Sequence, residues 1–163
     1  MDILSLSVIT AESPSHGAED HIEIAINGRP LRDLILDAEA QTKPPGERGS
    51  WRGDLCPLPR RTLASSREWL TPPADPRVGR WIAIYTCGCG IFGCGGFVAR
   101  LSAFPDDVVV WSEFADVYWS QSAHWDDGEE SPYPVWKRVA LAQVGPFRFG
   151  YADYQRDVSS ILS

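Results

Sequence analysis

Alternation of side chains between residues 80 and 114 is the feature that most constrains the fold of this chain. The runs RWIAIYT, FVARLSAF and DVVVWSEF each place every second side chain on one face of an extended strand. A glycine-rich connection and then the turn-forming PDD separate the three runs. We therefore expect three consecutive antiparallel strands, a meander over residues 80–114. Its buried face is predicted to carry Ile82, Ile84, Phe97 and Leu101.

The segments on either side of the meander add strands and helices. ILSLSVIT alternates as a strand does, HIEIAINGRPL places three isoleucines on one face before an Asn-Gly turn, and GPFRF suits one more short strand. The spacing of apolar residues in LRDLILDAEA predicts a short helix over residues 31–40, and YADYQRDVSSIL predicts a C-terminal helix. No βαβ alternation appears. The expected class is α+β, with both helices packed on an antiparallel sheet.

Length and composition suit one folding unit. The chain has 163 residues, of which 44% are hydrophobic, enough to bury a core, so we expect a single globular domain over residues 1–163. Residues 41–79 are rich in proline, glycine and arginine and are expected to form an irregular excursion. MDILSLSVIT lacks a basic n-region and a cleavage site, and no run approaches about 18 apolar residues, so we expect a cytoplasmic protein without a membrane span.

The charge distribution narrows the class of partner. A formal net charge of -7 argues against a general binder of nucleic acid or of anionic membranes. Residues 101–135 hold eight acids and no Lys or Arg, whereas residues 43–80 hold eight Lys and Arg against four acids. Any partner of the acidic region is therefore expected to be a protein or small molecule of cationic character.

Aromatic residues coincide with the acidic region. Four tryptophans and two tyrosines lie within residues 111–136, and these residue types contribute much of the binding energy at interfaces. We expect a non-enzymatic binding or interaction protein that uses this region; the alternative is that the large side chains only fill the core. The candidate binding residues are Trp119, Trp125, Asp126, Asp127, Tyr133 and Trp136.

The segment CGCGIFGCGG, residues 87–96, holds three cysteines and five glycines. If a four-residue loop joins two paired strands here, Cys89 faces Cys94 and Cys87 faces Gly96, with the three thiols on one side of the ribbon. A glycine bulge would change this parity. That side is expected to be the less apolar one, shared with Trp81, Ala83, Tyr85, Val98 and Arg100.

Three interpretations of the cysteines remain open. Buried thiols packed in a tight turn are favoured, because free cysteine is among the most buried residue types. A thiol- or zinc-dependent enzyme or redox protein is the alternative: zinc prefers four ligands, and a disulfide between Cys89 and Cys94 suits the expected geometry. The candidate zinc ligands are Cys87, Cys89, Cys94 and Cys56, with His16, His21 and His124 as outside candidates. No cofactor is expected if the thiols are structural.

Other catalytic signatures are missing from the sequence. It contains no Gly-x-Gly-x-x-Gly, Walker-type loop, Gly-x-Ser-x-Gly or His-Glu-x-x-His. The acidic run WDDGEE lacks the spaced ligands of an EF-hand loop and is expected to be a solvated loop. No catalytic residue is therefore assigned.

CGCGIFGCGG, VVVWSEF and GPFRFGYADYQ together resemble a group of uncharacterised bacterial proteins. These carry Cys-x-Cys-Gly-x-x-Gly-Cys-Gly ahead of a Trp-Ser-Asp/Glu-Phe strand, and the resemblance covers roughly residues 80–162. It implies a bacterial origin and brings no activity with it.

Overall fold

The computed structural model describes residues 1–13, 17–42, 55–61, 69–75, 77–86, 95–119 and 136–162. Over these ranges the chain forms a nine-stranded antiparallel sheet in the order β1-β2-β4-β5-β6-β7-β8, with β3 on β2 and β9 on β7. The strands are β1 (Leu4–Ser13), β2 (Gly17–Ile26), β3 (Arg29–Pro30), β4 (Cys56–Pro59), β5 (Arg80–Thr86), β6 (Gly95–Phe104), β7 (Val108–Trp119), β8 (Trp136–Ala140) and β9 (Phe147–Gly150). The helices are α1 (Leu31–Thr42) and α3 (Tyr151–Leu162). Within these ranges, no helix has the length and apolar content to cross a membrane.

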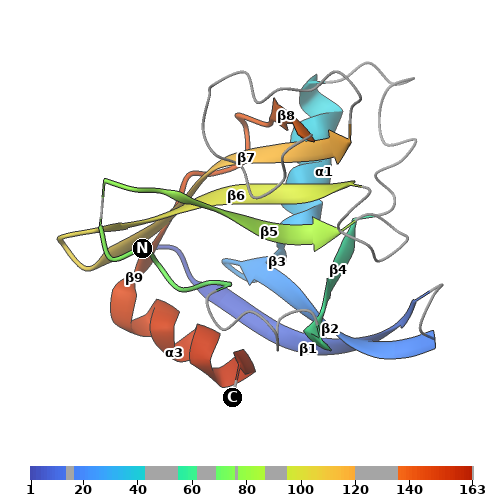
Figure 1. Cartoon of the computed structure of the whole chain (residues 1–163), viewed down its shortest axis with the longest axis horizontal. Helices are drawn as coiled ribbons and strands as arrows, with labels where there is room; N and C mark the ends of the chain where they lie inside the picture. Colours follow the sequence, from blue (N-terminus) through green and yellow to red (C-terminus); the bar gives the residue numbers. More distant parts are fainter. Residues whose placement is uncertain are drawn as a thin grey trace.

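The sheet curls until its two ends meet, so that it is nearly a barrel. Strand β9 pairs with the beginning of β7, and β8 pairs with the end of the same strand. The outer edge of β9 then meets Asp2, two residues before the start of β1. The amide of Asp2 donates to the carbonyl oxygen of Arg148 (2.7 Å), and the amide of Arg148 donates to Oδ2 of Asp2 (2.8 Å). Figure 1 shows β1 and β2 on one side of the molecule and β5 to β7 on the other.

The turn that follows β2 has the conformation that the Asn-Gly pair predicts. Asn27 and Gly28 both have positive φ, 52° and 79°, as a type I′ turn requires. Oδ1 of Asn27 also accepts a hydrogen bond from the amide of Ile3 (2.9 Å). The turn leads into β3 and, directly after it, α1.

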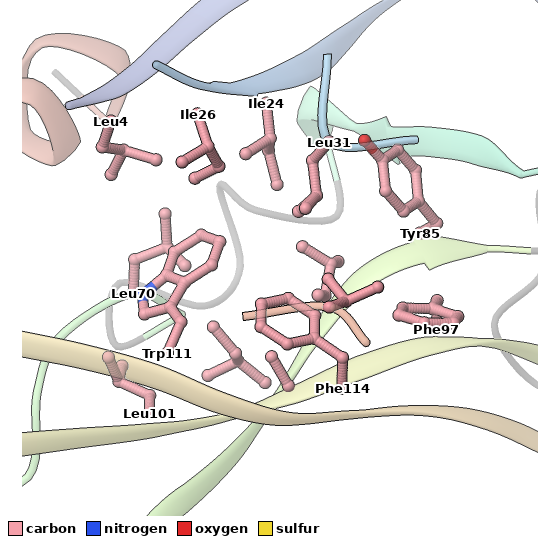
Figure 2. Packing of buried hydrophobic residues seen from close by; sticks show 14 of the residues in the cluster. Leu4, Ile24, Ile26, Leu31, Leu70, Tyr85, Phe97, Leu101, Trp111 and Phe114 are labelled. Atoms are coloured by element: carbon pink, nitrogen blue, oxygen red, sulfur yellow. The ribbon is translucent and has the colours of Figure 1, made fainter. Parts of the chain in front are cut away.

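Apolar side chains fill the space between the two walls of the sheet (Figure 2). Helix α3 contributes Tyr154, Val158 and Ile161, and α1 contributes Leu31 and Ile35. Burying one such side chain stabilises the fold by about 1.5–3 kcal/mol. The fully buried large residues of this core include Ile22, Ile24, Ile26, Leu70, Tyr85, Phe97, Trp111, Phe114 and Phe149.

The meander predicted over residues 80–114 is confirmed as β5, β6 and the first part of β7. All four residues predicted for its buried face, Ile82, Ile84, Phe97 and Leu101, are in the core. The predicted helices are also observed, and α1 extends to Thr42. The sheet is larger than the prediction, because the Pro-containing β4 lies within the expected irregular excursion and β8 was not expected.

The predicted register between β5 and β6 is wrong. Ala83 pairs with Val98 but Tyr85 pairs with Phe97, so Ile84 is an extra residue in a bulge. The bulge turns Tyr85 into the core beside Ile84, although alternation placed it on the less apolar side. Val98, expected on that side too, is also buried.

The bulge also changes the pairing between the end of β5 and the beginning of β6. Gly96 pairs with Thr86, and not with Cys87 as predicted. The expected facing pair of Cys89 and Cys94 lies outside the described residues.

Candidate functional site

Both regions that the sequence singled out border the same end of the sheet. Strands β5 and β7 end at Thr86 and Trp119, and their antiparallel neighbours β6 and β8 begin at Gly95 and Trp136. Cys56, the first residue of β4, pairs with Thr86. We refer to Cys56, Thr86, Gly95, Trp119 and Trp136 as the cysteine–tryptophan end. It lies on the right in Figure 1, where the arrows of β5 and β7 point.

Two of the predicted binding residues are direct neighbours across this end. Trp119 is the last residue of β7 and pairs with Trp136, the first residue of β8. The Cα atoms of directly opposed residues in an antiparallel pair are about 4.5–5.5 Å apart. The other four candidates, Trp125, Asp126, Asp127 and Tyr133, lie outside the described residues. In the sequence, residues 120–135 hold four acids and no Lys or Arg.

Another tryptophan of the aromatic region has a structural role. Trp111 is buried in the core, where its ring packs edge-on against Phe149 and Tyr154. The alternative weighed for this region, that its large side chains fill the core, is therefore correct for Trp111.

Of the four candidate zinc ligands, the structure describes Cys56. It is half-buried and lies opposite Thr86, whose hydroxyl donates a long hydrogen bond to the carbonyl oxygen of Cys56 (3.4 Å). Cys87 follows Thr86 in the chain, so the register places Cys56 beside the strand residue that precedes the cysteine run. Cys87, Cys89 and Cys94 lie outside the described residues.

Histidine does not complete a metal site in the part of the chain that is described. His21 pairs with Pro59, the last residue of β4, so it lies about 10 Å along that strand from Cys56. No group of three or more His, Cys, Asp or Glu side chains in the described ranges could hold a metal ion. His16 and His124 lie outside these ranges.

His21 instead belongs to a buried polar group on β2. Its Nδ1 lies 3.0 Å from the carbonyl oxygen of Glu19, and its Nε2 lies 3.7 Å from Oε1 of the same residue. Arg61, just after β4, donates from Nε to Oε2 of Glu19 (2.8 Å). Glu19 thereby joins the beginning of β2 to the residues after β4.

Two buried carboxylates were missed from the sequence. Asp116 and Glu39 are each 2% exposed. Asp116 follows Phe114 by two residues and pairs with Phe97; an irregularity in β7 between Ser112 and Ala115 shifts the alternation there. Glu39 follows Ile35 by four residues on α1, which is the spacing of one helical face. For Glu39, an acidic residue at the core spacing of a helix was the available signal, whereas alternation from Trp111 places Asp116 on the opposite face.

A third polar group joins β2, α1 and β5. Arg32 donates from Nη2 to Oε2 of Glu23 (2.7 Å), and burial nevertheless raises the pKa of Glu23 above its ordinary value. Tyr85 lies nearby, and burial, with a smaller contribution from the charge of Glu23, raises the pKa of its hydroxyl. That hydroxyl is buried without a hydrogen bond of good geometry, and a backbone group of Arg32 beside it lowers its pKa less than burial raises it. It therefore stays protonated and is unsuited to act as a base.

A groove of about 410 Å³ separates α3 from residues 70–72. Its walls combine apolar side chains with neutral polar groups, so it offers no charge to select an ionic ligand. The lining residues are Leu70, Thr71, Pro72, Tyr154, Gln155, Val158, Ser159 and Leu162.

Comparison of the chain with protein-family models, with curated proteins and with solved structures found no match. The resemblance drawn from CGCGIFGCGG thus stays a prediction, and a function has to be argued from the fold and the charges.

Proposed function

We propose that the protein is a non-enzymatic binding protein that holds a cationic partner at the cysteine–tryptophan end. The observation that carries this proposal is the pairing of Trp119 with Trp136. This register pairs the two residues that flank the acidic segment 120–135 in the sequence. Two candidate aromatic residues and the candidate acids therefore belong to one continuous stretch that starts and ends at neighbouring positions.

The charges suit a partner rich in arginine or lysine. The acids of residues 120–135 would attract such a partner, and the net charge of -7 would add to the attraction at a distance. A guanidinium also stacks favourably on an indole ring, better than on other aromatic rings. An arginine-rich protein segment combines both properties and is the partner class we propose.

Titration of the protein with an arginine-rich peptide, followed by calorimetry at low and high salt, tests this proposal. Binding should weaken as salt rises, because exposed charges are screened beyond about 8 Å at physiological ionic strength. The double variant Asp126→Asn/Asp127→Asn should bind about 5-fold or more weakly. A peptide that fails to bind at low salt would contradict the proposal.

The matched control removes two charges at the other end of the same sheet. Asp106 and Asp107 lie in the exposed turn between β6 and β7, and Asp107 has a φ of 57°, which asparagine accepts readily. Asp106→Asn/Asp107→Asn should leave peptide affinity within about 2-fold. If both double variants lose affinity equally, net charge explains the binding and the cysteine–tryptophan end does not.

A second variant pair addresses the tryptophans. Trp136→Ala should weaken binding, whereas Trp81→Ala should not, because Trp81 lies towards the opposite end of β5 and pairs with Arg100. Equal affinity of Trp136→Ala and the unaltered protein would remove the tryptophan pair from the site.

A second candidate function is zinc binding by Cys56, Cys87, Cys89 and Cys94. The pairing of Cys56 with Thr86 favours it, since the fourth cysteine then lies beside the start of the cysteine run. Four thiolates make a closed tetrahedral site of the kind that stabilises a fold. We propose that such a site would hold the cysteine–tryptophan end together and would not catalyse a reaction.

Elemental analysis of untagged protein, followed by cobalt substitution, tests the zinc proposal. One metal per chain and a thiolate-to-cobalt absorption band are expected, and Cys56→Ser and Cys89→Ser should each remove the band. The control His21→Gln should keep it, because His21 lies at the other end of β4. Protein that binds neither metal while its thiols are reduced would show that the cysteines are structural.

A further inference from the structure

Two hydrogen bonds show which residues of β1 point their backbone N–H and C=O groups away from β2. The amide of Asn27 donates to the carbonyl oxygen of Ile3 (2.9 Å), so the backbone groups of Ile3 face β2. The amide of Asp2 points the other way and donates to Arg148 on β9. Because these directions alternate along a strand, the outward-facing groups of β1 belong to its even-numbered residues. In the part of the strand from Val8 to Ser13 these are Val8, Thr10 and Glu12.

This part of β1, from Val8 to Ser13, has an accessible edge. In the strand order of the described residues, β1 is the last strand, with β2 as its neighbour along its length. Helix α3 contacts β1 and lies beside its first part in Figure 1, where the rest of β1 and β2 extends beyond β4. Val8 is 40% exposed, and Thr10 and Glu12 are exposed as well.

The edge lacks the features by which proteins usually prevent strands from pairing at their edges. Such features are a short strand, Lys or Pro on the edge, or a bulge. Strand β1 has ten residues, pairs with β2 without any shift of register, and contains no Lys, Arg or Pro. Its single charged residue is Glu12.

We propose that this edge binds a second copy of the chain, with the two β1 strands antiparallel about a twofold axis at Thr10. In this register Thr10 faces Thr10 of the partner subunit, and Val8 faces Glu12 of the partner subunit. Each facing pair would exchange two backbone hydrogen bonds. The register keeps the two copies of Glu12 apart, so the strand is complementary to itself in hydrogen bonding and places no two like charges opposite one another.

The dimer extends the exposed β1–β2 ribbon, which is marginal on its own, into a four-stranded sheet. The two copies each carry a net charge of -7, so they repel one another at long range. Added salt screens this repulsion and favours the dimer. This dependence is opposite in sign to that expected for binding of a cationic peptide, so the two proposals are tested separately.

Light scattering coupled to gel filtration, over a range of protein and salt concentrations, measures the dimer. Val8→Pro removes an outward amide and leaves the bonds between β1 and β2 in place, because proline is tolerated on the outer side of an edge strand. This variant should be monomeric at concentrations where the unaltered protein dimerises. The control Val8→Thr keeps the amide and the β-branched shape and should still dimerise. An unaltered protein that stays monomeric up to its solubility limit would overturn the proposal.

Oxidative cross-linking tests the dimer independently, even if Val8→Pro fails to fold. Thr10→Cys places two thiols opposite one another in the dimer, with Cα atoms at about 5.5 Å, a distance that a disulfide spans. It should form a covalent dimer rapidly. Ala18→Cys, an exposed position on β2 opposite Glu12, should not. Equal cross-linking of both variants would refute pairing through β1, as would a Val8→Pro protein that is folded and dimerises normally.

Discussion

The indole N–H of Trp111 donates a hydrogen bond to the hydroxyl of Tyr154 (3.2 Å), which in turn donates to the carbonyl oxygen of Leu70 (2.9 Å). Trp111 lies on β7 and Tyr154 on α3, and their rings meet edge to face with centroids 6.3 Å apart. One buried hydroxyl thus joins the sheet, the C-terminal helix and the segment before β5. Burial raises its pKa, so it remains a donor over the physiological range.

Tyr154→Phe should lower the free energy of unfolding by about 1–3 kcal/mol, because it leaves the buried indole N–H of Trp111 and the carbonyl of Leu70 without this partner. Urea denaturation followed by circular dichroism measures the change. A variant as stable as the unaltered protein would show that these two groups find other partners or water.

Tyr85→Phe is expected to affect the free energy of unfolding differently from Tyr154→Phe. The hydroxyl of Tyr85 is buried and makes no hydrogen bond of good geometry, although a backbone group of Arg32 lies beside it, so its removal deletes a polar group that gains little from the fold. The free energy of unfolding should stay the same or rise by about 1–2 kcal/mol. A loss of more than about 1 kcal/mol would mean that the hydroxyl has a partner such as bound water.

Gly145→Ala should destabilise the protein more than Gly17→Ala does. Both glycines have a φ of 70°, where an added Cβ is strained, and Gly145 also precedes Pro146, which restricts a residue that carries a Cβ. At Gly145 the Cβ would also meet the ring of Phe114 at 2.8 Å, whereas at Gly17 it would meet no described atom within 4 Å. The clash with Phe114 should add about 1–3 kcal/mol to the difference between their unfolding free energies. Equal losses would show that the ring moves aside readily.

Glu23→Gln tests the pH dependence that follows from its burial. Because the pKa of Glu23 is raised in the folded state, the folded protein binds more protons than the unfolded chain just above pH 4.5. This contribution to stability is therefore present below the ordinary pKa and is lost as the pH rises through the folded pKa. Relative to the unaltered protein, Glu23→Gln should gain stability as the pH rises through this window.

Thermal unfolding at a series of pH values measures the effect of Glu23→Gln. The matched control is Glu12→Gln, which removes one negative charge from an exposed position on the neighbouring strand. A constant difference between Glu23→Gln and the unaltered protein across the window would contradict the raised pKa.

Local patterns were enough to predict the elements whose period or turn chemistry is strong. The Asn27-Gly28 turn, the meander and the faces of both helices follow from short-range spacing, and they agree with the structure. The bulge at Ile84 was not predictable from alternation, because a bulge depends on how two strands fit together. Its effect was to reverse the side assigned to Tyr85.

Features that depend on distant residues were beyond a reading of the sequence. The closing contact joins Asp2 to Arg148, which are 146 positions apart. The β4 sequence CPLP has two prolines and resembles a loop, yet the neighbouring strands on both sides hold it in the sheet. For the candidate site, composition identified the cysteine and tryptophan segments separately. Their common place at one end of the sheet required the register.

Because β4 is short, we expect the sheet to separate first along this strand. Two residues of β4 pair with β2 and two pair with β5, and two of its four residues are prolines that donate no hydrogen bond. The ladders on either side are much longer: β1 and β2 share ten residue pairs. A force that pulls β2 and β5 apart would therefore meet few hydrogen bonds at β4. Mechanical unfolding should begin as a lengthwise tear there, while the β1–β2 ribbon and the meander remain intact on either side of it.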